Sequence, residues 1–300
     1  MFPQPTRILR FSLLTVFTGI SFTSLAQTQP PVQSDEKPSS QSVQIEQANN
    51  LVRAQHWDEA VKLYLEVLRL DPDNASVQNN LGHTFGQLGR LDDAVSCLER
   101  AVALEPDNAL FRYNLGNTYL RSDSVNNAIR ELMKAAELRP DYPEPYNDLG
   151  NAYLEQGEYN KAIASLSRAI ELSPNSAVAY NNLGTTYYQL GRFEQARDQF
   201  SKALALSGDN FQFHYNLGAA NLSLKRYANA AESFKTALRL DPDDPKTHYS
   251  LGIAYLGLKD RGASLQQYSM LRNLNSELAT KLYQAIHIRR LVSAETVNEK

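Results

Sequence analysis

Carboxamide side chains recur along the middle of this 300-residue chain at intervals of 34 residues. Asn80, Asn114, Asn182 and Asn216 form one such series, and Asp148 takes the same position in it. A carboxamide both donates and accepts hydrogen bonds, so it can pair with a peptide N–H and C=O together, or with sugar hydroxyls. Together with neighbouring asparagines and tyrosines, the series predicts a row of ligand-binding residues. The candidate residues are Asn79, Asn80, Tyr113, Asn114, Asn117, Asn147, Asp148, Asn151, Asn181, Asn182, Tyr215 and Asn216.

The remaining reactive residue types do not form a catalytic or metal-binding motif. The sequence contains no P-loop, no dinucleotide-binding GxGxxG, no GxSxG nucleophile elbow and no HExxH zinc motif. His214 and His248 lie one 34-residue interval apart and are expected in the core, and the single Cys97 excludes an internal disulfide or a thiolate cluster. We therefore predict a non-enzymatic protein with no cofactor and no metal. A hydrolase whose catalytic residues are dispersed along the chain is the enzymatic alternative.

Other residue types keep the same 34-residue interval and define a repeated unit. The markers are the pairs Leu81-Gly82, Leu115-Gly116, Leu149-Gly150, Leu183-Gly184, Leu217-Gly218 and Leu251-Gly252, the alanines Ala60, Ala94, Ala128, Ala162, Ala196 and Ala230, and the prolines Pro72, Pro106, Pro140, Pro174 and Pro242. The markers divide the chain into about seven copies, at residues 41–74, 75–108, 109–142, 143–176, 177–210, 211–244 and 245–278. Positions within a copy are numbered below from the first residue of that copy.

Each copy is predicted to fold as two helices. Tyr146 and Leu149 belong to an apolar series with helical spacing, and Leu166 belongs to a second series in the same copy. Gly150 and Ala162 remove bulk where the two helices cross. A glycine after the first helix and a proline near the end of the second are typical helix stops, and the Asp and Asn residues behind the proline favour a turn and the next N-cap. A single hairpin cannot bury its own apolar face, so neighbouring copies must stack.

This pattern resembles the tetratricopeptide repeat (TPR) family across residues 43–278. The resemblance implies an all-α, right-handed superhelical solenoid of about seven helical hairpins. Residues 279–292 are expected to add a capping helix over the last apolar face, and residues 293–300 a tail. The resemblance also implies that ligands lie along the concave surface built by the first helices. Repeat positions 2, 5, 6, 9, 12 and 13 are expected to line that surface.

The N-terminus has the features of an export signal. Arg7 and Arg10 precede an apolar run, and small residues around Ala26 fit a cleavage site, so residues 1–26 are predicted to be a signal peptide. An uncleaved N-terminal membrane tether is the alternative. Residues 27–42 are rich in Pro, Gln and Ser and are predicted to be a flexible linker. We expect the protein to be periplasmic or extracellular.

Composition excludes several function classes. The chain has 30 Lys and Arg against 33 Asp and Glu, a formal net charge of −3, so it has no basic field for nucleic acid. No apolar run is long enough for a transmembrane span that would remain after signal cleavage. The oligomeric state is not indicated.

Two functions of different classes fit these features. The first is a non-catalytic protein-interaction scaffold that holds an extended partner segment in a groove lined by Asn and Tyr. The alternative is a glycan-binding module of an exopolysaccharide assembly or export system, although the single Trp57 lies at a packing position. The asparagine series is either a ligand site or a surface inherited with the repeat. Because its positions lie off the packing stripe, replacing Asn114, Asn182 and Asn216 by Ala is expected to leave the melting temperature nearly unchanged.

Overall fold

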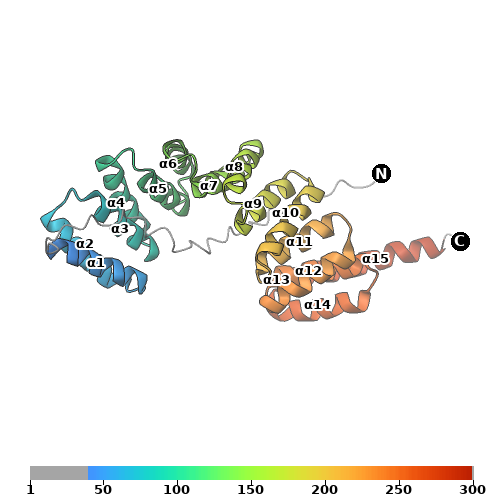
Figure 1. Ribbon diagram of the computed structural model, residues 1–300. Coiled ribbons are helices and arrows are strands. Elements are labelled where there is room, and N and C mark those ends of the chain that lie inside the picture. Colours follow the sequence, from blue (N-terminus) through green and yellow to red (C-terminus); the bar gives the residue numbers. More distant parts are fainter. Residues whose placement is uncertain (1–39, 299–300) are drawn as a thin grey trace. The chain divides into compact units, whose positions relative to one another are not determined.

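The computed structural model describes the backbone of residues 40–298 and the side chains of residues 40–287, and in this part all regular secondary structure is helical. The helices are α1 (Ser40–Arg53), α2 (Trp57–Leu70), α3 (Ala75–Gln87), α4 (Leu91–Leu104), α5 (Ala109–Arg121), α6 (Val125–Leu138), α7 (Pro143–Glu155), α8 (Tyr159–Leu172), α9 (Ala177–Gln189), α10 (Phe193–Leu206), α11 (Phe211–Ser223), α12 (Tyr227–Leu240), α13 (Pro245–Gly257), α14 (Arg261–Leu274) and α15 (Ser276–Asn298). Consecutive helices from α1 to α14 pair as hairpins that follow one another along the chain (Figure 1). The predicted all-α solenoid of stacked hairpins is confirmed.

The two ends of the helical array differ from the predicted boundaries. The first helix begins at Ser40, inside the stretch 27–42 that was expected to be a linker. The last helix, α15, extends beyond the expected range 279–292 in both directions and includes most of the expected tail. It starts early because the Asn275 Oδ1 atom accepts a hydrogen bond from the backbone N–H of Leu278 at 2.9 Å. It continues to Asn298 because the sequence up to that residue holds no glycine or proline to stop it.

The predicted signal peptide, residues 1–26, and residues 27–39 of the predicted linker lie outside the described residues. Across the part of the chain that is described, we find no helix with the length and apolar character that crossing a membrane requires.

Helix starts and stops follow the residue types that the repeat supplies. The side chains of Asn74, Ser176 and Asp244 accept hydrogen bonds from backbone N–H groups in the first turn of the following helix, as N-caps do. After the first helix of each copy, repeat position 15 has a positive φ. Glycine occupies it in three copies, with Gly157 at a φ of 75°, and Gln, Asp or Lys occupies it in the other four. The turn geometry is thus the same in all copies, even where the preferred glycine is absent.

Glycine at repeat position 8 sets how closely the two helices of a hairpin approach. A Cβ atom added to Gly116 would lie 2.8 Å from Leu132 Cγ, and one added to Gly184 would lie 2.7 Å from the ring of Phe200. Leu132 and Phe200 occupy the same repeat position, 24, on their respective second helices. The fully buried alanines at repeat position 20 keep the other side of the crossing narrow.

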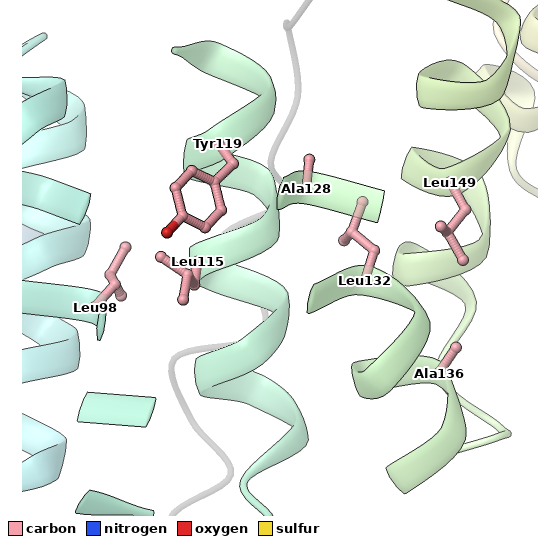
Figure 2. Close-up of a cluster of buried hydrophobic side chains, with 7 residues drawn as sticks. All are labelled: Leu98, Leu115, Tyr119, Ala128, Leu132, Ala136 and Leu149. Carbon is pink, nitrogen blue, oxygen red and sulfur yellow. The ribbon is translucent and has the colours of Figure 1, made fainter. Parts of the chain in front are cut away.

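Apolar clusters join side chains of neighbouring hairpins. The cluster drawn in Figure 2 joins side chains from α4, α5, α6 and α7. Its members are Leu98, Leu115, Tyr119, Ala128, Leu132, Ala136 and Leu149. At the C-terminal end, Leu282 and Ile286 of α15 pack on Leu256 and Leu271 in the same way, so α15 covers the last apolar face as a capping helix would.

First helices contact one another, whereas second helices do not. Each of α1, α3, α5, α7, α9 and α11 contacts the next first helix in the chain, and among the described residues no two second helices from α2 to α14 are in contact. Each second helix contacts the first helix that follows it. We call the surface formed by α1, α3, α5, α7, α9, α11 and α13 the first-helix face. It carries all of the predicted binding residues.

Candidate functional site

The predicted binding residues lie on five consecutive first helices. They are Asn79 and Asn80 on α3, Tyr113, Asn114 and Asn117 on α5, Asn147, Asp148 and Asn151 on α7, Asn181 and Asn182 on α9, and Tyr215 and Asn216 on α11. The structure therefore brings them together in one row along the first-helix face. The sequence did not reveal that many of them are hydrogen-bonded to one another.

Asparagines of neighbouring repeats are joined to each other by side-chain hydrogen bonds. At three junctions the amide at repeat position 6 donates from Nδ2 to the Oδ1 atom at position 5 of the preceding repeat. These bonds are Asn114 to Asn79 at 2.8 Å, Asn182 to Asn147 at 3.1 Å, and Asn216 to Asn181 at 2.8 Å. Each bond connects residues 35 positions apart and so spans two first helices.

The other junctions make the same connection with different residues. Between α1 and α3, Asn80 Nδ2 donates to Asn49 Oδ1 at 3.2 Å. Between α5 and α7, the Asp148 carboxylate accepts from Asn117 Nδ2 at 3.1 Å and from the Tyr113 hydroxyl. Between α11 and α13, a side-chain hydrogen bond joins Tyr215 and Ser250. We call this series of bonds, from Asn49 to Ser250, the polar ladder.

The polar ladder corrects one sequence-based expectation. Asn79, Asp148 and Asn216 were expected to face an open groove, but they are only 5 %, 8 % and 3 % exposed. They are buried because repeat positions 5 and 6 lie where one first helix meets the next, so their side chains point toward the neighbouring helix. Replacing ladder asparagines is therefore expected to destabilise the fold, and the sequence-based expectation of an unchanged melting temperature is wrong in its premise.

Other residues of the first-helix face remain accessible. Repeat positions 2 and 13 flank the ladder and are exposed at Glu144, Val178, Glu155 and Gln189, with Val178 at 42 %. Sequence reasoning placed positions 2 and 13 on this face but did not include these residues in the binding set. At repeat position 9, the Asn151 Oδ1 atom is buried and has no hydrogen-bond partner among the described residues.

The C-terminal part of the first-helix face is more apolar than the middle. Leu222 of α11 and Ile253 of α13 are half-buried, as are Tyr188 and Tyr249. The Tyr188 hydroxyl lies 3.1 Å from Ser223 Oγ, which adds a second polar connection between α9 and α11. The apolar character could have been read from repeat position 9 of the last two copies, where Ala219 and Ile253 replace the asparagines found at this position in three earlier copies.

Burial sets the electrostatics of the middle of the face. Burial raises the pKa of Asp148 to about 6, a shift that its hydrogen bonds from Asn117, Asn147 and Tyr113 oppose. Burial likewise raises the pKa of Tyr113 well above its ordinary value, and the neighbouring Asp148 adds to that shift. Exposed Glu144 contributes further negative charge to this region.

The Asp148→Asn variant is expected to be more stable than the wild type at neutral pH. Between the ordinary pKa of 3.8 and the folded value of about 6, the folded chain holds a proton that the unfolded chain has released. The carboxylate therefore lowers stability progressively as the pH rises through this range, by about 2–3 kcal/mol at most. Asparagine restores the residue found at position 6 of four other copies and carries no charge. Urea unfolding from pH 4 to pH 8 should show a steeper decline of stability in the wild type than in the variant, which keeps the raised pKa of Glu155, and parallel curves for both proteins would contradict this.

The reactive side chains outside the row are engaged in packing or hydrogen bonds. His248 is buried, with Nδ1 2.7 Å from Gln267 Oε1 and Nε2 2.9 Å from the Pro242 carbonyl. His214 Nε2 lies 2.8 Å from the Gly208 carbonyl. Burial raises the pKa of the Cys97 thiol to about 11, so it is not a thiolate at neutral pH. Within the described range, no group of three or more His, Cys, Asp or Glu side chains is placed to hold a metal ion.

Comparisons with known proteins agree with the repeat architecture. A family model described as TPR repeat matches residues 48–89, 82–123, 124–157 and 150–191, and one described as tetratricopeptide repeat matches residues 181–245 and 227–272. A search of curated protein sequences finds no match.

Several solved structures share the fold. A crystal structure of MamA is 30 % identical to this chain, covers 54 % of it and 94 % of MamA, and has a TM-score of 0.51. The PilF structure from Pseudomonas aeruginosa is 20 % identical, covers 72 % of this chain and 98 % of its own, and has a TM-score of 0.63. YrrB, described as a TPR protein with an unusual peptide-binding site, is 20 % identical over 65 % of this chain and 97 % of its own, with a TM-score of 0.51. With family models matching from residue 48 to residue 272 and hairpins of the expected kind throughout, this chain belongs to the tetratricopeptide repeat family.

Proposed function

We propose that this protein is an exported, non-catalytic scaffold whose first-helix face binds an extended segment of a protein partner. Membership of the TPR family indicates a protein-interaction role. The observation that carries the proposal is the polar ladder, because it holds successive first helices in one register and leaves a continuous row of side chains beside it. A surface fixed in this way loses little conformational freedom when a ligand binds.

The structure changes which residues are proposed to contact the partner. Most ladder amides already use a donor or acceptor on each other, so they offer fewer hydrogen bonds to a ligand than the sequence suggested. The accessible contacts are the flanking residues Glu144, Val178 and Gln189, with Leu222 and Ile253 supplying apolar area toward the C-terminal end.

The same features favour a protein partner over a glycan. Exposed tryptophan is the usual stacking surface for a sugar ring, and Trp57 is the first residue of α2, a second helix, and so does not lie on the first-helix face. Amide groups of the ladder are already hydrogen-bonded to one another and are therefore less available to bind sugar hydroxyls. The YrrB structure, which shares the fold alone, indicates that hairpins of this kind can carry a peptide-binding site.

A crosslinking pull-down from the native envelope fraction tests the proposal. The bait is the mature chain beside a face variant, Glu144→Arg/Val178→Arg/Gln189→Arg, which changes only exposed side chains and leaves the ladder intact. We expect the wild type to capture one or a few proteins that the face variant loses. The export signal is tested by the same fractionation, since the protein must be found in the envelope or outside the cell.

The matched control carries the same three types of change on α10: Glu194→Arg, Gln195→Arg and Leu206→Arg, all at exposed positions. It should capture the same proteins as the wild type. Capture that survives in the face variant would place binding elsewhere and contradict the proposal. Retention of polysaccharide without any protein would favour the glycan-binding alternative.

A further inference from the structure

A second surface, away from the first-helix face, has an unbalanced charge. A cavity of about 570 Å³ opens between the second helices α12 and α14 and has α13 as its floor. Lys235 and Arg239 of α12 line one side, Met270 of α14 lines the other, and Leu251 and Tyr255 of α13 form the floor. Met270 is 50 % exposed, so its apolar side chain is accessible at the cavity. The cavity thus combines two cations with an accessible apolar surface.

The two cations have no acidic partner. None of the residues that line the cavity carries a carboxylate. Lys235 Nζ lies 5.6 Å from the centre of the Tyr255 ring, and Arg239 Nη2 donates to Thr236 Oγ1 at 3.0 Å. Among the described residues, neither cation forms an ion pair with Asp or Glu, and both are exposed.

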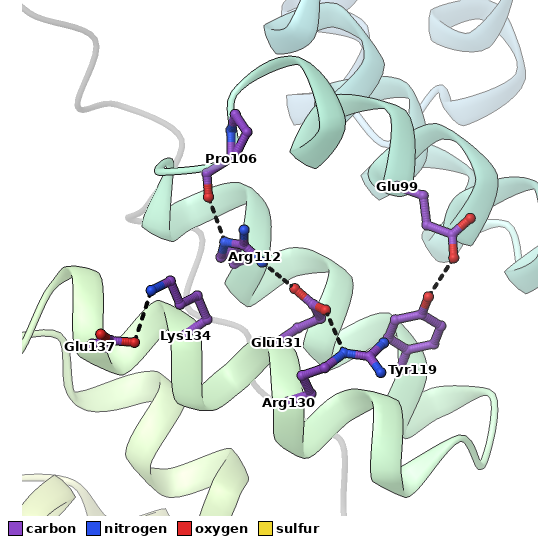
Figure 3. A network of polar contacts seen from close by, with 8 residues as sticks. All are labelled: Glu99, Pro106, Arg112, Tyr119, Arg130, Glu131, Lys134 and Glu137. Atoms are coloured by element: carbon purple, nitrogen blue, oxygen red, sulfur yellow. Dashed lines mark hydrogen bonds and ion pairs between the residues drawn. The ribbon is translucent and has the colours of Figure 1, made fainter.

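The equivalent junction between the second and third copies contains acidic as well as basic side chains (Figure 3). At the repeat position of Lys235 stands Glu99, which accepts a hydrogen bond of 2.5 Å from the Tyr119 hydroxyl. The Arg112 Nη1 atom lies 2.7 Å from Glu131 Oε2, and the Arg130 side chain pairs with the other oxygen of the same carboxylate. At that junction the two arginines share the Glu131 carboxylate, and Glu99 accepts from a neutral hydroxyl.

At the α12–α14 junction the same repeat positions lack these acids. His248 and Gln267 replace Arg112 and Glu131, and Lys235 replaces Glu99. The neutral Gln267 amide satisfies His248 without supplying charge. Gln266 likewise replaces Arg130, so the cations that pair with Glu131 are missing here together with that acid. Lys235 and Arg239 are therefore added cations, and no residue that lines the cavity supplies a carboxylate for them.

We infer that this cavity binds an acidic segment of a partner protein. A carboxylate of the segment would lie between Lys235 and Arg239, and an adjacent apolar side chain would pack against Tyr255 and Met270. Two cations on a chain of net charge −3 fit a short peptide segment better than a nucleic acid, whose binding needs an extended basic surface. The inference does not depend on the proposed function, because the cavity lies on second helices and uses none of the first-helix face.

Fluorescence anisotropy with a labelled, acetylated peptide of alternating Glu and Leu tests the inference on the full mature chain. We expect saturable binding that weakens with salt, and at least a tenfold loss of affinity in the Lys235→Glu/Arg239→Glu variant. The Met270→Asp variant should also lose affinity while keeping both cations. The control, Lys62→Glu/Arg69→Glu on α2, makes the same change at two exposed second-helix positions and should bind as the wild type does.

Three results would overturn the inference. The first is no binding of the acidic peptide, or equal binding of the same peptide with Gln in place of Glu. The second is an equal loss of affinity in the α2 control, which would show a general charge effect. The third is binding of a DNA oligonucleotide or anionic lipid vesicles that depends on Lys235 and Arg239 when the peptide does not bind, which would assign the cavity to another class of partner.

Discussion

Replacing Asn114, Asn182 and Asn216 together by alanine is expected to lower the free energy of unfolding by about 3–5 kcal/mol. Each change deletes the donor of one ladder bond and leaves an Oδ1 atom of the preceding repeat without its partner. The largest share should come from Asn216, which is buried. Alanine also favours helices more than asparagine does, so the measured loss is net of that gain. Urea and thermal unfolding followed by circular dichroism measure it.

The matched control replaces three exposed asparagines on second helices, Asn160, Asn229 and Asn273, by alanine. These side chains take no part in the ladder, so the control should be as stable as the wild type or slightly more stable because of the higher helix propensity of alanine. If the ladder variant unfolds at the same urea concentration as this control, the bonds between the first helices contribute nothing and the structural role assigned to them is wrong.

Gly150→Leu is expected to cost about 3 kcal/mol or more and to lower the melting temperature sharply. A Cβ atom alone at this position would lie 2.7 Å from Leu166 Cδ2 and closer still to its Cγ. Leu166 is fully buried and cannot move into solvent, so a whole leucine side chain would force α7 and α8 apart. Because neighbouring hairpins stack on both helices, the strain would reach the adjacent copies.

Two further variants separate overpacking from a general effect of substitution. Gly208→Ala adds a Cβ whose nearest neighbour is 3.8 Å away and should leave the melting temperature nearly unchanged. Adding Leu166→Ala to Gly150→Leu makes room at the crossing and should recover part of the lost stability. An unperturbed unfolding curve for Gly150→Leu would contradict the assignment of repeat position 8 to the helix crossing.

The architecture could be predicted from sequence because each marker acts locally or within one hairpin. A glycine was expected to end the first helix of a copy, and Gly89, Gly157 and Gly191 do so with φ between 73° and 75°. Gly150 was expected at a helix crossing and lies against Leu166. The same glycine positions recur in several copies of the 34-residue repeat, so the prediction did not depend on any one residue.

The role of the asparagine row could not be predicted in the same way. Helical spacing places Asn114 and Asn182 on the side of a first helix that faces away from its own second helix. It does not give the angle at which the next first helix approaches, and that angle decides whether the amide meets solvent or the Oδ1 atom of a neighbour. Residues 35 apart had to be seen in space before the ladder was evident.

The cavity beside α12 was missed for a related reason. Lys235, Tyr255 and Met270 come from three helices, and each residue alone reads as an ordinary surface or packing residue. Only the comparison of the copies shows that the sixth alone has a cation at both repeat positions 25 and 29, which are Lys235 and Arg239. Within a repeat protein, such departures from the chain's own pattern are a guide to binding sites.

The central claim, that the asparagines of the first helices bind one another and not an open groove, is tested most directly by NMR of their side-chain amides. In the ligand-free protein, the Nδ2 protons of Asn114, Asn182 and Asn216 are expected to exchange with water much more slowly than those of exposed Asn160. The same protons should show through-space contacts with the side chains of their acceptors, Asn79, Asn147 and Asn181. Slow exchange would confirm that the polar ladder joins the repeats. Exchange as fast as that of Asn160 would contradict the ladder and return the asparagines to the role of free ligand contacts.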